Sequence, residues 1–364
     1  MGRPAGSTFD AYSSPVGSHV TLTLDHPQAM APPPPPPPAL EDVPRDVRPD
    51  RPGVDVGFRG AAYGVAGTVL LIFGSIGVFL FVKAWPAIKH YGWSYFTTAD
   101  WNPESNTVGV AGALVGTIEV ALVALAVAIP IATGLALFIS EYAPGAVKGT
   151  LVSLVDLMAA VPSIIFGIWG AAQLQPHATY IARWLHQNLG WIPIFRVDAD
   201  PNAAQWAQSR YTTSMFIAGL CVSMMVIPIA TSVMRGVFAA APLGEREAAY
   251  ALGSTRWGMV RTVVLPFGRG GIIGGTMLGL GRALGETVAV LLILSIDYGF
   301  HFRILQTNGV TISALIANRF GDATSLQLSA LLLAGLVLFV VTLVVNTGAT
   351  LVVNRSRSGA ATEI

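Results

Sequence analysis

Charged side chains are scarce in this sequence. Asp, Glu, Lys and Arg make up 11% of its 364 residues, whereas a soluble domain averages about 25%. So few charges would not cover the surface of a water-soluble fold of this length, but a lipid bilayer requires no such cover. The formal net charge of +1 also excludes the strong basic field that nucleic-acid binding needs. Composition therefore favours an integral membrane protein and no nucleic-acid partner.

Cysteine is nearly absent, and the other residue types that hold metals are scattered. Cys221 is the single cysteine, which excludes a disulfide within the chain and a metal site built from several thiolates. No histidine falls in a long apolar run, and Cys, His and Asp form no cluster. We therefore predict that the chain itself holds neither a metal nor a cofactor.

The first part of the chain differs from the rest, because residues 32–38 are all proline. Proline lacks an amide hydrogen and favours polyproline II, so such a stretch does not build a packed core. We expect a disordered cytoplasmic tail over residues 1–58, a membrane domain over 59–357 and a short C-terminal tail over 358–364.

Six segments are long and apolar enough to cross a bilayer core, which needs about 20 helical residues. They cover roughly residues 61–82, 110–139, 150–172, 213–234, 271–296 and 326–353. Backbone groups must pair within each segment at that depth, so the expected fold class is all-α, a polytopic membrane protein. Pro130, Pro162 and Pro228 should kink the second, third and fourth spans.

The direction of insertion follows from Arg and Lys, which collect in cytoplasmic segments. More of them flank the spans on the side that holds both termini, above all in residues 235–269, than on the other side. We therefore predict cytoplasmic termini, with residues 83–109, 173–212 and 297–325 outside. The first of these outer segments is rich in Trp, Tyr and Phe, and we expect it along the outer membrane–water interface.

The loop expected between the fourth and fifth spans, residues 235–269, carries a set of residues at fixed spacing. They are Glu247, Ala248, Ala249, Gly253, Val263, Leu265 and Pro266. The set resembles the coupling motif of importer permeases in the ATP-binding-cassette (ABC) superfamily: Glu-Ala-Ala, three residues, Gly, nine residues, Ile, one residue, Leu-Pro. Valine 263 in place of isoleucine is the only departure. The resemblance implies a six-span importer permease whose loop couples to an ATPase.

The residues of this coupling loop also predict its local shape. A short helix is expected over residues 242–252, and Gly253 suits its C-terminal cap because glycine tolerates a left-handed backbone. A second helix is expected over residues 255–264, ended by Pro266. The loop should form a helical elbow whose small alanines let another surface approach closely.

ATP hydrolysis is not expected in this chain. A phosphate-binding P-loop needs a lysine directly after a glycine, and none of the lysines, Lys83, Lys89 and Lys148, follows one. We therefore predict that the chain is not an enzyme, and that ATP and Mg are used by a partner ATPase that grips the coupling loop.

The cargo is indicated by residues 281–287, which read Gly-Arg-Ala-Leu-Gly-Glu-Thr. This run resembles the phosphate-specific permeases, and its continuation in Val-Ala-Val is similar to their PstC type rather than the PstA type. Residues 140–144, Ser-Glu-Tyr-Ala-Pro, add to the resemblance, which covers residues 63–355. The implied function is a membrane permease subunit for inorganic phosphate.

The resemblance also implies a complex in the cell (inner) membrane. Its other members would be a second homologous permease of the PstA type, two ATP-binding-cassette ATPase subunits and an extracytoplasmic phosphate-binding protein, with lipid around the permeases. A permease for another cargo, an ion-driven transporter or channel, and a membrane-embedded enzyme remain open alternatives. An ion-driven transporter would need more intramembrane carboxylates than Glu119 and Asp156, and an enzyme would need a polar cluster.

Arg282 and Glu286 are the candidate residues of the substrate pathway. They stand four residues apart and are expected on one face of the fifth span. An arginine at bilayer depth is usually paired or lines a polar cavity, and a guanidinium binds phosphate through two parallel hydrogen bonds. We expect Arg282 to contact phosphate and Glu286 to hold it and offset its charge; a structural ion pair or a gating role stays open.

Glycines recur along the fifth span at a spacing of four. One set is Gly271, Gly275 and Gly279, and the other is Gly281 and Gly285. Each set lies along one helix face, where missing side chains let backbones approach closely. We expect these faces to pack against the second permease, although glycine kept for flexibility alone would give the same pattern.

Overall fold

The computed structural model describes residues 52–197 and 209–356, which form helices and one small hairpin. The elements before the internal gap are α1 (Pro52–Tyr91), α2 (Ser94–Thr97), β1 (Trp101–Asn102), β2 (Thr107–Val108), α3 (Ala111–Leu137), α4 (Gly145–Ala159), α5 (Ser163–Trp169) and α6 (Gln175–Leu189). After it come α7 (Ser209–Thr212), α8 (Met215–Ala239), α9 (Leu243–Ala251), α10 (Arg256–Met259), α11 (Leu265–Gly285), α12 (Val288–Ile293), α13 (Ile312–Arg319) and α14 (Ser325–Ser356). Three π-helical turns, η1 (Phe138–Tyr142), η2 (Gly170–Leu174) and η5 (Val260–Val264), and two 3-10 turns, η3 (Pro193–Phe195) and η6 (Phe320–Asp322), complete the described chain. The predicted all-α class is confirmed.

The chain divides into two compact units, Met1–Ala61 and Ala62–Ile364. Of the first unit, the structure describes only the start of α1. Residues 52–58 are helical there, contrary to the tail predicted over them; Pro52 opens the helix, where its missing amide hydrogen costs no bond. The proline run at 32–38 and the C-terminal residues 358–364 lie outside the described residues.

Five helices of the described chain are long and apolar enough to cross a membrane. They cover Asp55–Tyr91, Ala111–Tyr142, Met215–Ala239, Arg256–Gly285 and Ser325–Gly348. The third predicted span instead falls on two helical stretches, Gly145–Ala159 and Ser163–Leu189, that meet at 89°. By length and composition there are therefore five crossings, or six if this bent pair counts as one.

The prolines predicted to kink spans behave differently from one another. Pro162 lies between α4 and α5 with an extended backbone (φ −59°, ψ 140°) and marks the bend. Pro130 and Pro228 lie inside α3 and α8, which continue through them. Past the bend, α5 packs tightly on α12: a Cβ added at Gly167 would lie only 2.8 Å from Ala289 Cα. A proline within an apolar run therefore breaks the helix at position 162 but not at positions 130 and 228.

The fifth predicted span, residues 271–296, is interrupted. α11 ends at Gly285, and Glu286 has an extended backbone (ψ 129°). Ser313 Oγ donates a hydrogen bond to the Glu286 carbonyl at 2.8 Å, and the Ala289 amide at the start of α12 donates to the Glu286 carboxylate at 3.4 Å. Irregular backbone is tolerated at membrane depth where protein buries it, and Glu286 is only 8% exposed.

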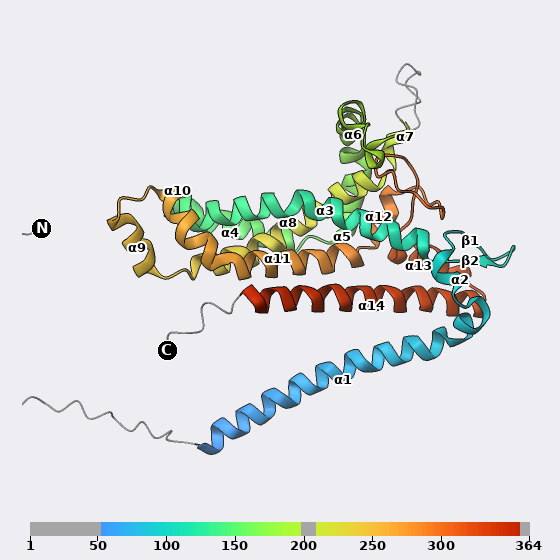
Figure 1. Cartoon of the computed structure of the whole chain (residues 1–364), viewed down its shortest axis with the longest axis horizontal. Helices are drawn as coiled ribbons and strands as arrows, with labels where there is room; N and C mark the ends of the chain where they lie inside the picture. The colour runs from blue at the N-terminus through green and yellow to red at the C-terminus, as the bar shows by residue number, and fades with distance from the viewer. Residues whose placement is uncertain (1–51, 198–208, 357–364) are drawn as a thin grey trace, which may run out of the picture. The chain divides into compact units, whose positions relative to one another are not determined.

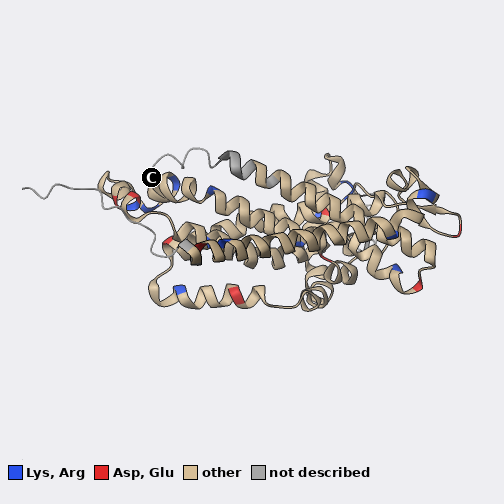
Figure 2. Cartoon of the chain, turned by 90° about the horizontal axis from the view of Figure 1, so that it is seen from below, with Lys and Arg blue, Asp and Glu red and all other residues tan. Residues whose placement is uncertain are grey.

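Helices α3, α8 and α11 form the centre of the second unit. Figure 1 shows them side by side, with α14 next to α11. Small residues allow the close approach: Ala124, Ala128 and Ala132 recur along α3 and are fully buried. Figure 2 shows few Lys, Arg, Asp and Glu along the helices, and most of the helical surface is uncharged. Such a surface suits helices surrounded by lipid.

The segment 83–109, expected along the outer interface, is partly buried by the rest of the chain. Tyr95 has no exposed surface, and its hydroxyl donates to the Ala330 carbonyl of α14 at 2.7 Å. Trp101, in the antiparallel pair of β1 and β2, is also buried. Trp85, Trp93 and Phe96 keep exposed rings, and the interfacial position of the segment stays a prediction.

Candidate functional site

The coupling loop starts with α9, whose end has the geometry that the sequence predicts. Gly253 has a φ of +82°. Its amide donates to the Tyr250 carbonyl at 2.9 Å, and the Ser254 amide donates to the Ala249 carbonyl at 3.1 Å. These two bonds form a Schellman cap, which needs a left-handed residue directly after the helix. The C-terminal cap expected at Gly253 is confirmed.

Two of the three motif residues on α9 face outward. Glu247 and Ala248 are exposed, and Leu252 at the end of the helix is 88% exposed. Ala249 is buried, and α9 contacts η5. Figure 1 places α9 at one end of α8 and α11. The exposed carboxylate, alanine and leucine form a surface that another protein could cover.

The second half of the loop differs from the predicted helix that stops at Pro266. Thr255 caps α10 by accepting the Gly258 amide at 3.1 Å, and the helix then continues through η5 into α11. η5 is a π-helical turn in which the Leu265 amide donates to the Val260 carbonyl, five residues back. This wider turn lets the helix pass Pro266, which has no amide hydrogen and would clash in a regular turn.

The apolar end of the motif anchors the loop to the helices. Val263 and Leu265 are half-buried, and their neighbours Val260 and Val264 have no exposed surface. Buried valines and leucine hold this half in the core through the hydrophobic effect. The motif therefore has an outward half at α9 and an anchored half at η5.

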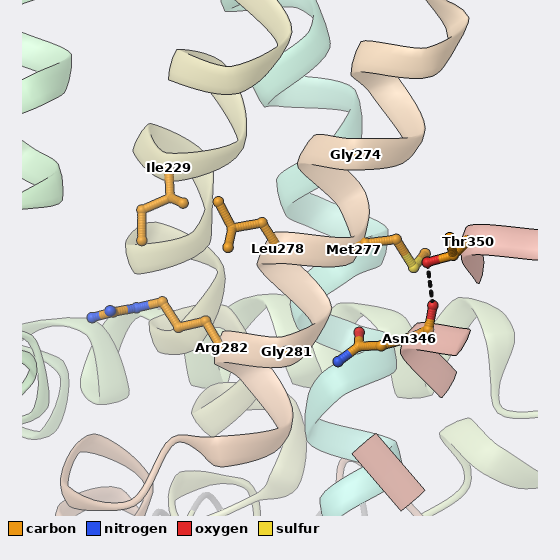
Figure 3. A pocket seen from close by; sticks show the side chains of 8 residues that line it. All are labelled: Ile229, Gly274, Met277, Leu278, Gly281, Arg282, Asn346 and Thr350. Atoms are coloured by element: carbon orange, nitrogen blue, oxygen red, sulfur yellow. Dashed lines mark hydrogen bonds between the residues drawn. The ribbon is translucent and has the colours of Figure 1, made fainter. Parts of the chain in front are cut away.

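Arg282 lies in the last turn of α11 and contacts α8. Its Nη2 is 3.9 Å from Met225 Sδ, and its buried Nε has no hydrogen-bond partner among the described residues. Arg282 also borders a hollow of about 540 Å³. Figure 3 shows the residues that line it, Ile229, Gly274, Met277, Leu278, Gly281, Arg282, Asn346 and Thr350. A guanidinium with unused donors beside a hollow is suited to bind an anion.

α14 supplies polar groups to this hollow that we did not predict. Thr350 Oγ1 donates to the Asn346 carbonyl at 2.9 Å. Figure 3 shows the Arg282 side chain extending away from both residues, toward α8. Their signal in the sequence is the spacing of four that relates Thr342, Asn346 and Thr350 along α14.

Glu286 does not share a helix face with Arg282. Because α11 ends at Gly285, the four-residue spacing no longer places the two side chains one above the other. No ion pair joins them in the described part of the chain, and the Glu286 carboxylate caps α12 instead. The predicted pairing is wrong in this structure, since Glu286 stabilises the break after α11.

The first glycine set packs α11 against α8 of the same chain. A Cβ added at Gly271 would lie 2.6 Å from Val237 Cβ, and one at Gly279 would lie 2.6 Å from Val226 Cγ1. Gly275 lies similarly close to α8. This contact within the chain differs from the expected contact with a second permease, because α8 already covers the face.

The second set is open on the described chain. No atom lies within 4 Å of a Cβ added at Gly281 or Gly285. Gly281 also borders the hollow next to Arg282. The face that remains free for another helix is therefore the one bearing Gly281.

Two further carboxylates within the predicted spans, Glu119 and Asp156, lie apart from the hollow. Glu119 on α3 is 8% exposed, and its Oε2 has no hydrogen-bond partner among the described residues. Asp156 on α4 accepts a hydrogen bond from Ser232 Oγ of α8 at 3.4 Å. Neither residue lines the hollow beside Arg282.

The sequence reasoning missed an ion pair at the base of the coupling loop. Arg246 of α9 donates to Glu141 of η1 at 3.1 Å. The signal was present, because Glu141 belongs to the Ser-Glu-Tyr-Ala-Pro run at residues 140–144. Without the fold, nothing placed that run next to α9.

Comparison with known proteins gives consistent matches. The family of binding-protein-dependent transport system inner membrane components matches residues 128–358. The phosphate transport system permease protein PstC 2 of Mycobacterium tuberculosis is 39% identical over 308 residues, which are 84% of this chain and 93% of that relative. The phosphate transport system permease protein PstC of Xylella fastidiosa is 41% identical over 260 residues, 71% of this chain and 78% of that relative.

Among solved structures, one similar chain belongs to a bacterial ABC transporter involved in the import of the acidic polysaccharide alginate. The TM-score is 0.51, and the match covers 83% of this chain and 97% of the other. The sequences are 18% identical, so this likeness concerns the fold alone.

Proposed function

Because the chain belongs to the family of binding-protein-dependent transport system inner membrane components, we propose that it is the permease subunit of an ATP-driven importer of inorganic phosphate. The observation that carries this proposal is its 39% identity to a phosphate permease along 93% of that relative. The helical fold and the coupling loop with an exposed α9 agree with it.

The proposed role of α9 is to receive a separate ATPase. Glu247, Ala248 and Leu252 face outward, and a small-residue surface with an exposed leucine admits close contact by another protein. The Schellman cap at Gly253 fixes the angle between α9 and α10. Movement of the ATPase would thus act on α10, η5 and α11 together. The chain's own part is transport, with ATP and Mg bound by the partner.

The proposed phosphate contact is Arg282. The planar fork of its guanidinium matches two oxygens of a phosphate. Its Nε has no partner among the described residues and it borders the hollow, so donors remain for a ligand. Glu286 would belong to the pathway by fixing the end of α11, and hence the position of Arg282, through its cap on α12.

The remaining partners follow from the family. We expect a second permease of the PstA type, two ATPase subunits and an extracytoplasmic phosphate-binding protein, with both termini of this chain in the cytoplasm. The open glycine face at Gly281 is the proposed contact with the second permease. Gly281 borders the hollow, so a partner helix at this face would lie next to the hollow.

Co-purification tests the class of this protein. The chain, expressed with its natural neighbours and extracted in mild detergent, should copurify with an ATP-binding-cassette ATPase and a second permease. Ala249→Arg should lose the ATPase while the second permease is retained, because an arginine does not fit at this buried position of α9. A chain that purifies without any ATPase would contradict an ATP-driven importer.

A further inference from the structure

The π-helical turn η1, at the end of α3, is tied to the coupling loop by a buried ion pair. Arg246 Nη1 lies 3.1 Å from Glu141 Oε2, and the Glu141 side chain is only 3% exposed. The other terminal nitrogen of Arg246, Nη2, donates to the Phe238 carbonyl near the end of α8 at 2.6 Å. One guanidinium on α9 therefore joins the ends of two long helices.

Neighbouring residues of η1 extend this contact. The Arg256 guanidinium of α10 lies over the Tyr142 ring, 5.4 Å from its centroid, a cation–π geometry. From α4, Lys148 Nζ donates to the Ser140 carbonyl at 3.5 Å. Consecutive residues of η1 thus contact α4, α9 and α10. Both helices of the coupling loop, α9 and α10, therefore contact the end of α3.

The chemistry of the pair makes it a firm connection. A planar guanidinium can serve two acceptors in fixed directions, whereas a lysine ammonium is a compact point charge. Removing one partner of a buried pair leaves an uncompensated charge, which is strongly unfavourable. Glu141 Oε1 and Arg246 Nε are buried without partners among the described residues, so the pair also has spare donors and acceptors with which to keep contact during a movement.

The position of η1 suits a segment that transmits movement between helices. π-helical turns within α-helices recur at functional sites, and η1 lies between α3 and α4, with the extended Ala143 after it (ψ 129°). Phe238, whose carbonyl the pair engages, is fully buried and packs onto Gly268 of α11. A displacement of α9 would therefore reach α3, α8 and α11 at one place.

We propose that Glu141, Arg246 and Tyr142 are positioning residues that pass movement of the coupling loop to α3 and α4, and so couple ATP hydrolysis to opening of the transport pathway. This inference rests on the proposed importer function. It assigns the Ser-Glu-Tyr-Ala-Pro run a role in coupling, separate from the ATPase contact at α9 and from phosphate binding at Arg282.

The test uses the whole reconstituted complex. The variants are Glu141→Gln, Arg246→Gln, their double substitution, and Tyr142→Leu with Tyr142→Phe as its matched control, which keeps the ring. Each is assayed for ATP hydrolysis and phosphate uptake. A second readout needs no cargo: the ATP-dependent change in labelling of Leu278→Cys, which borders the hollow, in a Cys221→Ser background.

We expect assembled complexes that still hydrolyse ATP, with uptake per ATP reduced about tenfold and the ATP-dependent labelling change lost. The double variant should be no worse than either single variant, because both break one connection, and Tyr142→Phe should behave as the unaltered chain. The proposed coupling role of Glu141, Arg246 and Tyr142 would be overturned by any of three results. Uptake and hydrolysis could fall in proportion, the effects of the two single substitutions could add, or the labelling response could stay unchanged. If the unaltered complex shows the labelling change but imports no phosphate, the proposed cargo is wrong. The labelling of the variants then still tests the coupling role of these residues.

Discussion

Arg282 combines a permanent charge with incomplete hydrogen bonding inside an apolar helix bundle. Its Nε has no partner in the described structure, and its Nη2 contacts the sulfur of Met225 at 3.9 Å. A thioether is a weak acceptor, so it does little to satisfy the guanidinium. A bound anion would supply the missing acceptors. This makes Arg282 the residue where cargo binding is best tested.

We predict that Arg282→Gln lowers phosphate uptake at least about tenfold, because hydrogen bonds to a charged group are worth about 1.5–3 kcal/mol each. The complex should still assemble and hydrolyse ATP. Arg282→Lys keeps the charge without the planar fork and should also transport poorly. The measurement is uptake into proteoliposomes with the binding protein present. Near-normal uptake by Arg282→Gln would leave this residue a structural role only.

Substitutions at Gly253 test whether the cap between α9 and α10 is needed for transport. Its φ of +82° is strained for residues with a β-carbon, and the left-handed region costs about 1–2 kcal/mol for them. Gly253→Val should therefore disturb the cap and abolish ATP-driven transport while the subunit still inserts. Gly253→Asn should retain more activity, since asparagine tolerates this region better. Equal transport by the two variants would show that the cap geometry is unimportant.

The packing of α11 on α8 carries the main prediction at the scale of whole elements. A Cβ at Gly275 would meet Met234 Cγ at 3.0 Å, and overpacking of a core costs about 1–3 kcal/mol. Gly275→Leu should lower the thermal stability of the purified subunit. Gly281→Leu, where no atom lies within 4 Å, is the matched control and should keep that stability.

The same pair separates contacts within the chain from contacts with a partner. Gly281→Leu should reduce recovery of the second permease in a pull-down, because the open glycine face is its proposed contact. If Gly275→Leu left stability unchanged and Gly281→Leu left recovery unchanged, the glycine faces would serve neither purpose.

Local signals predicted the parts of the fold that depend on neighbouring residues. Apolar runs located most spans, and the motif spacing placed a left-handed glycine at position 253. The break after α11 was not predictable in this way, because residues 288–296 continue the apolar run and the break depends on Ser313, which is distant in sequence. Likewise Pro162 breaks a helix while Pro228 does not, although both are prolines within apolar segments.

The arrangement of the candidate site was not predictable from the sequence. Arg282 and Glu286 stay predicted pathway residues, and the structure separates their side chains by ending the helix between them. Asn346, from the last helix, completes the hollow, and a single sequence does not reveal which helices are neighbours. The Arg246–Glu141 pair was missed for the same reason.

For the whole molecule, the orientation in the membrane remains a prediction from the Arg and Lys pattern. Labelling of single cysteines in a Cys221→Ser background tests it. Gln187→Cys on α6 should react with an impermeant thiol reagent added outside intact cells, because α6 belongs to an outer segment. Arg256→Cys on α10 should be shielded, and should react once the membrane is permeabilised. Both positions are exposed on the chain, so a reversed pattern would mean reversed insertion.

The most direct test of the central claim is phosphate accumulation by the purified complex in proteoliposomes. The ATP is supplied on the side of the membrane that carries the ATPase subunits. With the binding protein present, radiolabelled phosphate should accumulate only when ATP can be hydrolysed, and unlabelled phosphate should compete while sulfate should not. No ATP-dependent accumulation of phosphate, or equal competition by sulfate, would contradict a phosphate-specific ATP-driven importer.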